Sequence, residues 1–118
     1  MTNEDAITLF AALAQPTRLN TFKLLVAHEP EGLPAGEIAQ HLAVPHNTMS
    51  SHLAILTHAG LIGATRYSRS IIYRAKLERI QALLAFVLKD CCAGRPEICQ
   101  PLIDDLIPCC PSKETERV

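Results

Sequence analysis

Two helical segments separated by a brief turn constrain this sequence more than any other feature. AGEIAQHL (35–42) predicts a short helix, and after the turn AVP the segment HNTMSSHLAILTHAG (46–60) predicts a longer one. Within it Met49, Leu53 and Leu56 recur at spacings of four and three residues, which places them on one helical face. The pair therefore has the order of a helix-turn-helix.

A β-hairpin is expected directly after this pair. Gly60 is placed to end the second helix as a C-terminal cap. LIGATRY (61–67) and SIIYRAK (70–76) then surround a short polar turn and are rich in Ile, Tyr and Thr, which predicts two paired strands. Helix, turn, helix and hairpin together predict a winged helix-turn-helix, a mainly α fold with a β-hairpin wing.

Further helices are expected on both sides of this unit. Residues 3–14 predict a helix capped by Asn3, and Pro16 can open a second helix at its first position. HEPEGLP (28–34) predicts a loop because of its Pro and Gly content. A last helix is expected from Leu77 to about residue 89. The sequence thus predicts one domain over residues 1–90, followed by a cysteine-containing tail over residues 91–118.

The distribution of charge is more informative than the total. The formal net charge is only −1, yet residues 61–76 carry four basic side chains and no acid. A local basic patch is what contact with phosphates requires. The longest apolar run, residues 82–88, is far short of the roughly 18 residues of a membrane span. The N-terminus lacks the basic region of a secretory signal. These features predict a cytoplasmic protein with no membrane partner.

The second helix of the pair has a face suited to reading DNA. At about 100° per residue, small polar side chains fall opposite the apolar face and can approach base edges and phosphates. His52 lies near the apolar face and is interpreted as a packed histidine. Because Pro45 cannot cap with a side-chain oxygen, Asn47 is the expected cap. The alternative interpretation of this face is a solvated surface. The candidate DNA-binding residues, including two at the hairpin tip, are His46, Asn47, Thr48, Ser50, Ser51, Arg66 and Arg69.

Two segments of the chain are similar to a known family: TMSSHLAILTHAGLI (48–62), followed by Arg66 and Tyr73, and ALAQPTRLNTFKLL (12–25). Over about residues 5–90 the chain resembles the ArsR/SmtB family of metal-responsive repressors. The resemblance implies a homodimer built on the first and last helices, and binding to double-stranded operator DNA by the second helix and the wing. It also implies release when an inducer binds. By position, Asn47, Thr48, Ser50 and Ser51 match the family's DNA-reading segment.

The chain departs from the family at its best-known inducer sites. The Cys-Val-Cys arsenic site of the family would fall in PAGEIAQHL (34–42), which has no cysteine. The zinc-binding members use histidines and carboxylates on the last helix, whereas no histidine follows His58 here. The wing also carries Ser68 where glycine is common. An inducer would therefore have to bind elsewhere.

Five cysteines, all within the last 28 residues, offer that site: Cys91, Cys92, Cys99, Cys109 and Cys110. A disulfide framework would spread cysteines through the chain, so a cluster favours metal binding or redox chemistry. Adjacent cysteines rarely close a disulfide on each other, but a pair and one returning cysteine can hold a thiophilic centre such as trivalent arsenic.

Some repressors of the resembled family place their arsenic cysteines as a neighbouring pair and a third just past the last helix, and CCAGRPEIC (91–99) is similar. Cys91, Cys92 and Cys99 are thus the candidate ligands for trivalent arsenic, antimony or an organoarsenical. Cys109 and Cys110 could complete this site or form another.

The resulting hypothesis is a repressor of a metalloid-resistance operon, released from its operator when arsenic binds. Three alternatives stay open: a thiol-redox repressor of the same fold, a Cd- or Pb-sensing one, and a structural zinc protein without DNA binding. An enzyme is not expected, because the chain has no C-x-x-C, no glycine-rich phosphate loop and no plausible acid–base pair.

Overall fold

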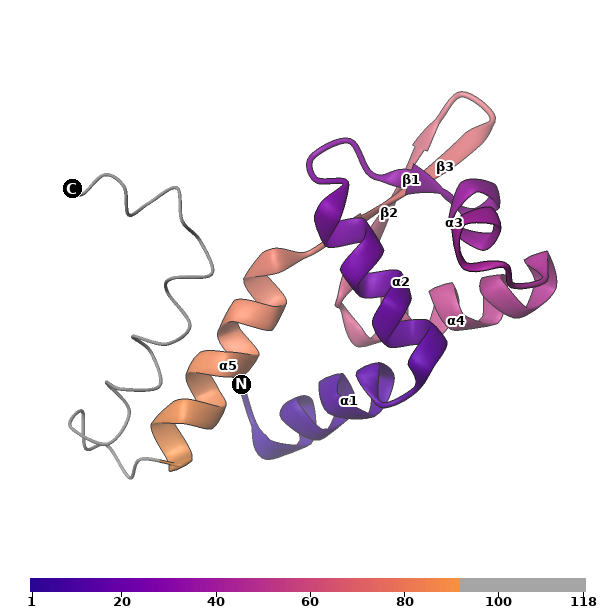
Figure 1. Ribbon diagram of the computed structural model, residues 1–118. Coiled ribbons are helices and arrows are strands. Elements are labelled where there is room, and N and C mark those ends of the chain that lie inside the picture. The colour runs from indigo at the N-terminus through magenta and orange to yellow at the C-terminus, as the bar shows by residue number, and fades with distance from the viewer. Residues whose placement is uncertain (92–118) are drawn as a thin grey trace, which may run out of the picture. The chain divides into compact units, whose positions relative to one another are not determined.

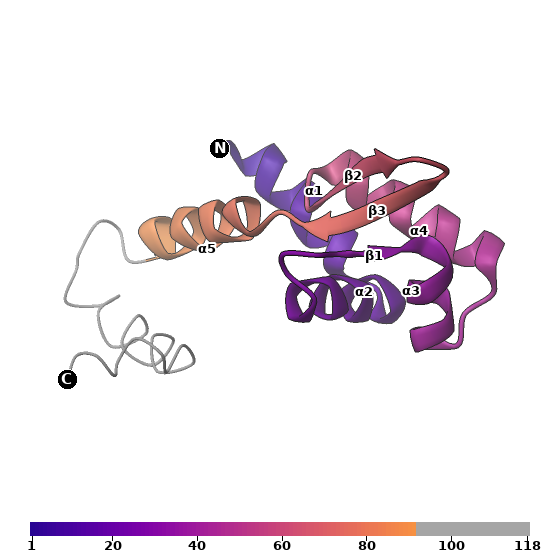
Figure 2. The ribbon, with the colours of Figure 1, turned by 90° about the horizontal axis from the view of Figure 1, so that it is seen from above.

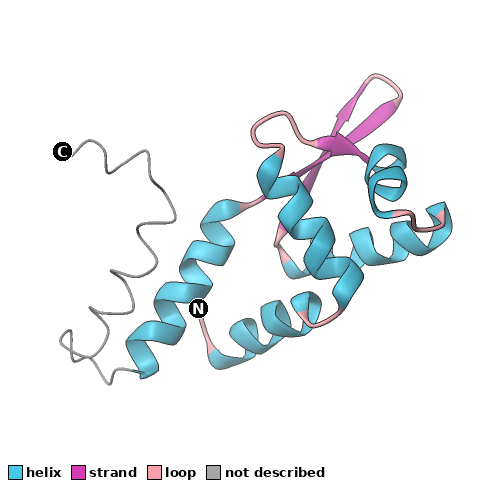
Figure 3. Ribbon diagram, viewed as in Figure 1, coloured by secondary structure: helices cyan, strands magenta, loops and turns pink. Residues whose placement is uncertain are grey.

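The structure is a computed structural model that describes residues 1–91, with side chains described as far as Leu88 (Figures 1 and 3). It separates into two compact units, residues 1–83 and 84–118, with the boundary inside the last helix. The elements, in chain order, are α1 (Asn3–Leu13), α2 (Pro16–Ala27), β1 (Leu33–Pro34), α3 (Ala35–Leu42), α4 (His46–Ala59), β2 (Ile62–Tyr67), β3 (Ser70–Ala75) and α5 (Leu77–Cys91). The winged helix-turn-helix predicted from the sequence is confirmed.

The sheet has three antiparallel strands in the order β1-β3-β2. β2 and β3 form the expected hairpin, in which Ile62 pairs with Ala75 and Tyr67 with Ser70. The expectation of a loop throughout residues 28–34 is wrong at its end, because Leu33 pairs with Tyr73 to form β1. Two residues are too few to show the alternation that marks a strand. Leu33 is nevertheless buried, so this strand adds one apolar side chain to the core.

The first helix begins with a capping box one residue earlier than expected. Thr2, not Asn3, is the N-cap: its hydroxyl accepts from the Asp5 backbone N–H, and the Asp5 carboxylate accepts from the Thr2 N–H, each at 3.1 Å. The reciprocal bonds satisfy two backbone donors that a helix start leaves free. The bond from the Thr2 backbone also holds the pKa of Asp5 below its ordinary value.

Helix boundaries elsewhere follow local chemistry. α2 starts with Pro16 at its first position, as predicted. α3 spans the expected residues, and α4 ends at Ala59 with Gly60 as its C-cap at φ 89°, a left-handed conformation that glycine adopts without strain. α5 reaches Cys91, slightly beyond the expected end. Among residues 1–91, no helix combines the length and apolar character needed to cross a bilayer.

The core of residues 1–83 lies where the helices meet the sheet. α4 packs against α1, α2, α3 and β2, and α2 also packs against β3 (Figures 1 and 2). Large, fully buried apolar side chains come from α1 to α4, from β2 and the residue before it, and from α5: Leu9, Leu25, Ile38, Met49, Leu53, Leu56, Leu61, Ile62 and Leu83. The core therefore holds α4 on most of its length, and fixes how the helix is rotated about its own axis.

Gly32 and Gly36 provide a matched pair for testing the loop that leads into β1. Gly32 has φ +76°, and a Cβ there would collide with the Tyr73 carbonyl oxygen and approach Arg74 Cγ to 2.6 Å. We expect Gly32→Ala to lower the free energy of unfolding by at least about 2 kcal/mol. Gly36 is helical with open space around it, so Gly36→Ala should be neutral or stabilising by up to about 1 kcal/mol.

Urea unfolding of both variants and the parent chain measures this difference. Equal midpoints for Gly32→Ala and Gly36→Ala would contradict the tight packing of the loop against β3.

Candidate nucleic-acid interface

α4 divides cleanly into a buried and an exposed face. Met49, Leu53 and Leu56 are at most 1% exposed and anchor the helix in the core. The candidate DNA-binding residues of this helix are all exposed: His46, Asn47, Thr48, Ser50 and Ser51. The helix thus presents its N-terminal polar side chains to solvent on a rigid support, as a recognition helix requires.

The start of α4 differs from the expectation. The N-cap is Pro45, which forms no side-chain cap bond, and Asn47 lies inside the first turn rather than at the cap. Its Oδ1 accepts from the Thr48 backbone N–H at 2.9 Å, while Ser51 Oγ donates to the Asn47 carbonyl at 3.5 Å. Among the described residues, the Asn47 amide NH2 group has no partner, so it is available as a donor to a base edge or phosphate.

The turn between α3 and α4 places the two helices at their angle. Ala43 adopts φ 54° at the end of α3, and its N–H and that of Val44 bond back to the carbonyls of Gln40 and Ala39. Satisfying the last carbonyls of α3 in this way ends the helix sharply. α4 then begins three residues later with its polar N-terminal turn exposed.

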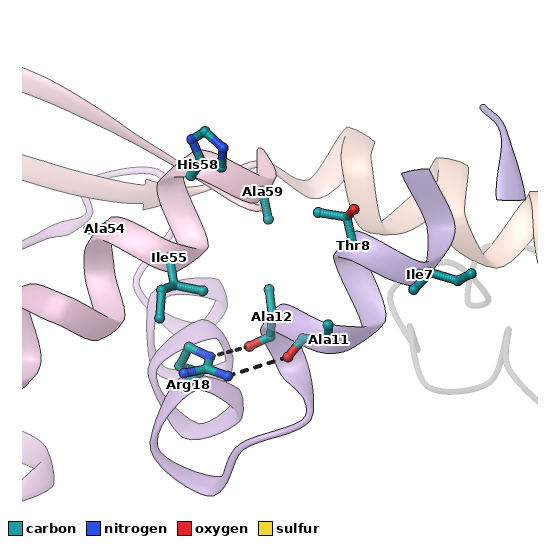
Figure 4. Close-up of a pocket in the computed structure, with 9 residues that line it drawn as sticks. All are labelled: Ile7, Thr8, Ala11, Ala12, Arg18, Ala54, Ile55, His58 and Ala59. Carbon is teal, nitrogen blue, oxygen red and sulfur yellow. Dashed lines mark hydrogen bonds between the residues drawn. The ribbon is translucent and has the colours of Figure 1, made fainter. Parts of the chain in front are cut away.

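His52 is half-buried, in accord with its interpretation as a packed side chain. Its Nδ1 lies 3.4 Å from Nη1 of Arg18, whose Nε also donates to the Ala12 carbonyl at 2.7 Å (Figure 4). Arg18 of α2 thereby connects the C-terminal end of α1 with the middle of α4. This contact could not be predicted from local sequence patterns, because Arg18 and His52 lie 34 positions apart.

The hairpin tip carries the two remaining candidate residues. Arg69 lies in the two-residue turn after Ser68, and Arg66 pairs across the hairpin with Ile71. Both arginines are exposed. Ser68 takes φ 59°, so the turn keeps the left-handed conformation that glycine favours even though serine occupies the position.

A third arginine of the hairpin, Arg74, forms an ion pair. Arg74 Nη2 donates to Glu29 Oε1 at 2.7 Å, and this hydrogen bond raises the pKa of Arg74. Because Glu29 opposes its charge, Arg74 adds less to the positive field of the wing than Arg66 or Arg69. The pair joins the loop before β1 to β3 and was not anticipated from the sequence.

The hairpin tip and the N-terminal end of α4 lie on the same side of the unit in two perpendicular views (Figures 1 and 2). The N-terminal turns of α4, with their exposed polar residues, and the hairpin tip, with the exposed Arg66 and Arg69, therefore lie on the same side of residues 1–83. A helix of this kind fits the major groove of DNA, and basic side chains beside it suit phosphates or the minor groove. The assignment of individual residues to DNA contacts stays a prediction.

The predicted cysteine site falls almost wholly outside the described residues. Cys91 is the last residue of α5, and nothing is described beyond it, so Cys92, Cys99, Cys109 and Cys110 lie outside. Within the part of the chain that is described, no group of three His, Cys, Asp or Glu side chains could hold a metal ion. The ligands for arsenic therefore stay predictions.

Known proteins share this architecture. Residues 13–62 match a family model described as a helix-turn-helix domain. The chain is 32% identical over 82 residues to the HTH-type transcriptional regulator YgaV of Escherichia coli K12, covering 70% of this chain and 81% of that protein. The family match spans α2, β1, α3, α4 and the first residue of β2, so it includes the exposed face of α4 but not Arg66 and Arg69 of the wing.

Two solved structures extend the comparison. An ArsR-like transcriptional regulator from Rhodococcus sp. RHA1 has a TM-score of 0.66 at 22% identity, with 91% of this chain and 93% of that chain covered, and shares the fold. A homodimeric winged helix-turn-helix DNA-binding domain from Mycobacterium bovis, described as a possible ArsR-family regulator, has a TM-score of 0.59 at 28% identity, with 71% of this chain and 75% of that chain covered.

These relatives are transcriptional regulators, not enzymes, as the sequence predicted. The matched residues contain the recognition helix and the elements that support it. The chain therefore belongs to the ArsR/SmtB family of winged helix-turn-helix, DNA-binding transcriptional regulators.

Proposed function

We propose that this regulator is a cytoplasmic homodimeric repressor of a metalloid-resistance operon, released from its operator when trivalent arsenic or antimony binds Cys91, Cys92 and Cys99. The observation that carries the proposal is the combination of a DNA-reading fold with five cysteines confined to the residues at and beyond the end of α5. Operator DNA and the thiophilic ion are thus assigned to different parts of one chain.

Dimerisation is supported by the apolar surface of α1. Ile7 is 65% exposed and Phe10 47% exposed on this helix. Large apolar side chains exposed together mark interaction surfaces in soluble proteins. The Mycobacterium bovis relative is described as homodimeric, and two copies would present two recognition helices to half-sites about one DNA turn apart.

Arsenic is favoured over other ions by the number and type of ligands. Three thiolates form the trigonal pyramid that trivalent arsenic prefers, whereas structural zinc takes four ligands. The pair Cys91 and Cys92 is separated from Cys99 by a segment containing Gly94 and Pro96. Glycine and proline allow the chain to turn back, so one pair and one returning thiolate could close on a single ion.

Release from DNA is expected to act through α5. Leu83 is 1% exposed, so the first turns of this helix are anchored in the core of residues 1–83, while its last residue is a ligand candidate. Closing three thiolates on an ion would pull on the end of α5 and alter the spacing of the two recognition helices. Allosteric coupling of about 1–3 kcal/mol would lower operator affinity roughly 5–150-fold.

A thiol-redox repressor is the second candidate, because adjacent cysteines in a cytoplasmic protein can also be oxidised. Peroxide would then release DNA as effectively as arsenite. Sensing of cadmium or lead would differ from sensing of arsenic in the stoichiometry of binding and in the ultraviolet absorption bands of the bound thiolates.

The wing arginines provide the first prediction for DNA binding. We expect the double substitution Arg66→Gln and Arg69→Gln to weaken operator binding and to reduce the slope of log K against log salt by about 3.6, since each phosphate contact contributes about 0.9 and a homodimer would lose four such contacts. Fluorescence anisotropy of labelled promoter DNA at several salt concentrations measures both quantities.

Arg74→Gln is the matched control, since it removes an arginine of the same hairpin whose charge Glu29 already opposes. A loss of slope at Arg74 equal to that at the tip would contradict the assignment of Arg66 and Arg69 to phosphates.

The cysteines provide the second prediction. In reducing buffer, arsenite should release the parent protein from promoter DNA, and the triple substitution of Cys91, Cys92 and Cys99 by serine should abolish release while leaving DNA affinity unchanged. The double variant Cys109→Ser and Cys110→Ser is the control, and should still respond. Anisotropy titrations with arsenite, antimonite, cadmium, zinc and peroxide separate the candidates.

Release of the triple variant by arsenite would refute the proposed site. Release by peroxide alone would favour the redox repressor. Higher transcript levels on deletion of the regulator would identify repression, and lower levels activation.

A further inference from the structure

Tyr67, the last residue of β2, has no role in the fold or in the sites described above. At 61% exposure it is the most exposed aromatic ring of residues 1–88. Its cross-strand partner is Ser70, and Ser68 begins the turn beside it. Aromatic residues stabilise hairpins through contact with large cross-strand neighbours, which a serine does not provide. Packing within the hairpin therefore does not account for the ring.

The hairpin carries this ring well beyond the core. Its base is buried at Ile62 and Ala75, and six cross-strand pairs run from there to Tyr67 and Ser70. At about 3.4 Å per residue, Tyr67 lies about 17 Å along the strand from Ile62. A two-residue turn, with Ser68 at φ 59°, closes the ladder directly after it. The ring is thus held by paired backbone and not by a long loop.

The tip presents different chemistry on its two faces. Successive side chains of a strand point to opposite faces, and cross-strand partners share a face. Arg66 therefore shares one face with Ile71, and Tyr67 shares the other with Ser70. Arg69 lies in the turn between the strands. Arginines beside an apolar side chain suit the minor groove of DNA, whose negative potential attracts the cation and whose sugars and base steps accept an apolar wedge.

The position of the tip agrees with this chemistry. The tip and the N-terminal end of α4 lie on the same side of the unit in two perpendicular views, whereas α1, to which dimerisation is assigned, lies away from the tip (Figures 1 and 2). A recognition helix in the major groove leaves the adjacent minor groove to a neighbouring element. The ring therefore continues the candidate DNA-binding surface and does not belong to the surface assigned to the dimer.

We infer that the Tyr67 ring enters the minor groove of the operator beside Arg66 and Arg69 and selects A·T base pairs there. The groove is about 6 Å wide and admits a ring on edge. The N2 amino group of guanine projects into it and would obstruct the ring, whereas an A·T pair has no such group. This base selection goes beyond the phosphate contacts predicted for the arginines, and it rests on the DNA-binding part of the proposed function.

Hydroxyl-radical footprinting tests the inference, because the radical attacks sugars that are accessible from the minor groove. The reduced full-length protein on its promoter DNA should protect sugars in a minor groove that flanks the contact of α4. Tyr67→Ser should lose this part of the protection and keep the rest. Tyr67→Phe is the matched control, since it keeps the ring and loses only the hydroxyl, and it should protect the DNA as the parent protein does.

Fluorescence anisotropy measures the corresponding affinities. Tyr67→Ser should weaken promoter binding at least about fivefold, and Tyr67→Phe by less than about twofold. The slope of log K against log salt should not change in either variant, because no charge is removed. Because Tyr67 is exposed and faces a serine, both variants should unfold at the urea midpoint of the parent protein, so a loss of affinity reports contact with DNA.

Base substitution tests the selectivity. The protected minor groove should contain A·T pairs, and G·C in their place should weaken binding of the parent protein at least about fivefold. Inosine·C, which lacks the N2 amino group and keeps the major-groove acceptors of G·C, should restore binding. Tyr67→Ser should bind all three DNAs with affinities within about twofold of one another.

Equal footprints and affinities of the parent protein and Tyr67→Ser would overturn the inference. So would a loss of affinity in Tyr67→Phe equal to that in Tyr67→Ser, since the hydroxyl and not the ring would then make the contact. An equal penalty for G·C in the parent protein and in Tyr67→Ser would also overturn it. These results leave the arsenite response untouched, whereas a parent protein that does not bind its promoter would overturn the proposed repressor function as well.

Discussion

The burial of one face of α4 is the constraint on which the rest of the structure depends. Met49, Leu53 and Leu56 are buried on the inner side of this helix, and the helix packs against α1, α2, α3 and β2. Because a helix has 3.6 residues per turn, fixing these three side chains also fixes which residues point outward. The polar surface of α4 is therefore a consequence of the core, and small polar residues can occupy it without any packing role of their own.

The same periodicity explains how much of the fold could be predicted. The spacing of the apolar residues identified α4, and β-branched residues on either side of a polar turn identified the hairpin. Contacts between distant residues were not accessible in this way. β1 is only two residues long, and Arg18 with His52, or Glu29 with Arg74, are brought together by the tertiary fold alone.

The exposure of the DNA-binding candidates was predicted from the sequence, whereas the geometry of the cysteine site was not. Exposure of the α4 and wing residues follows from pattern and turn chemistry, so their positions agree with expectation. The N-caps do not agree with expectation, because Thr2 and Pro45, rather than Asn3 and Asn47, precede α1 and α4. Neighbouring residues competing for a cap differ by small energies, about 1 kcal/mol, which sequence inspection does not resolve. The cysteines carry chemistry without a periodic pattern, so their residue type suggests ligands but gives no geometry.

The short strand β1 has a consequence for self-association. It forms one edge of the sheet, and an open edge can pair with a strand of another molecule. Here that edge is two residues long and ends in Pro34, which has no N–H to donate. Strand addition on this side is thereby blocked, and the opposite edge, β2, carries the exposed charge of Arg66. The sheet is thus poorly suited to pair edge to edge with the sheet of another molecule.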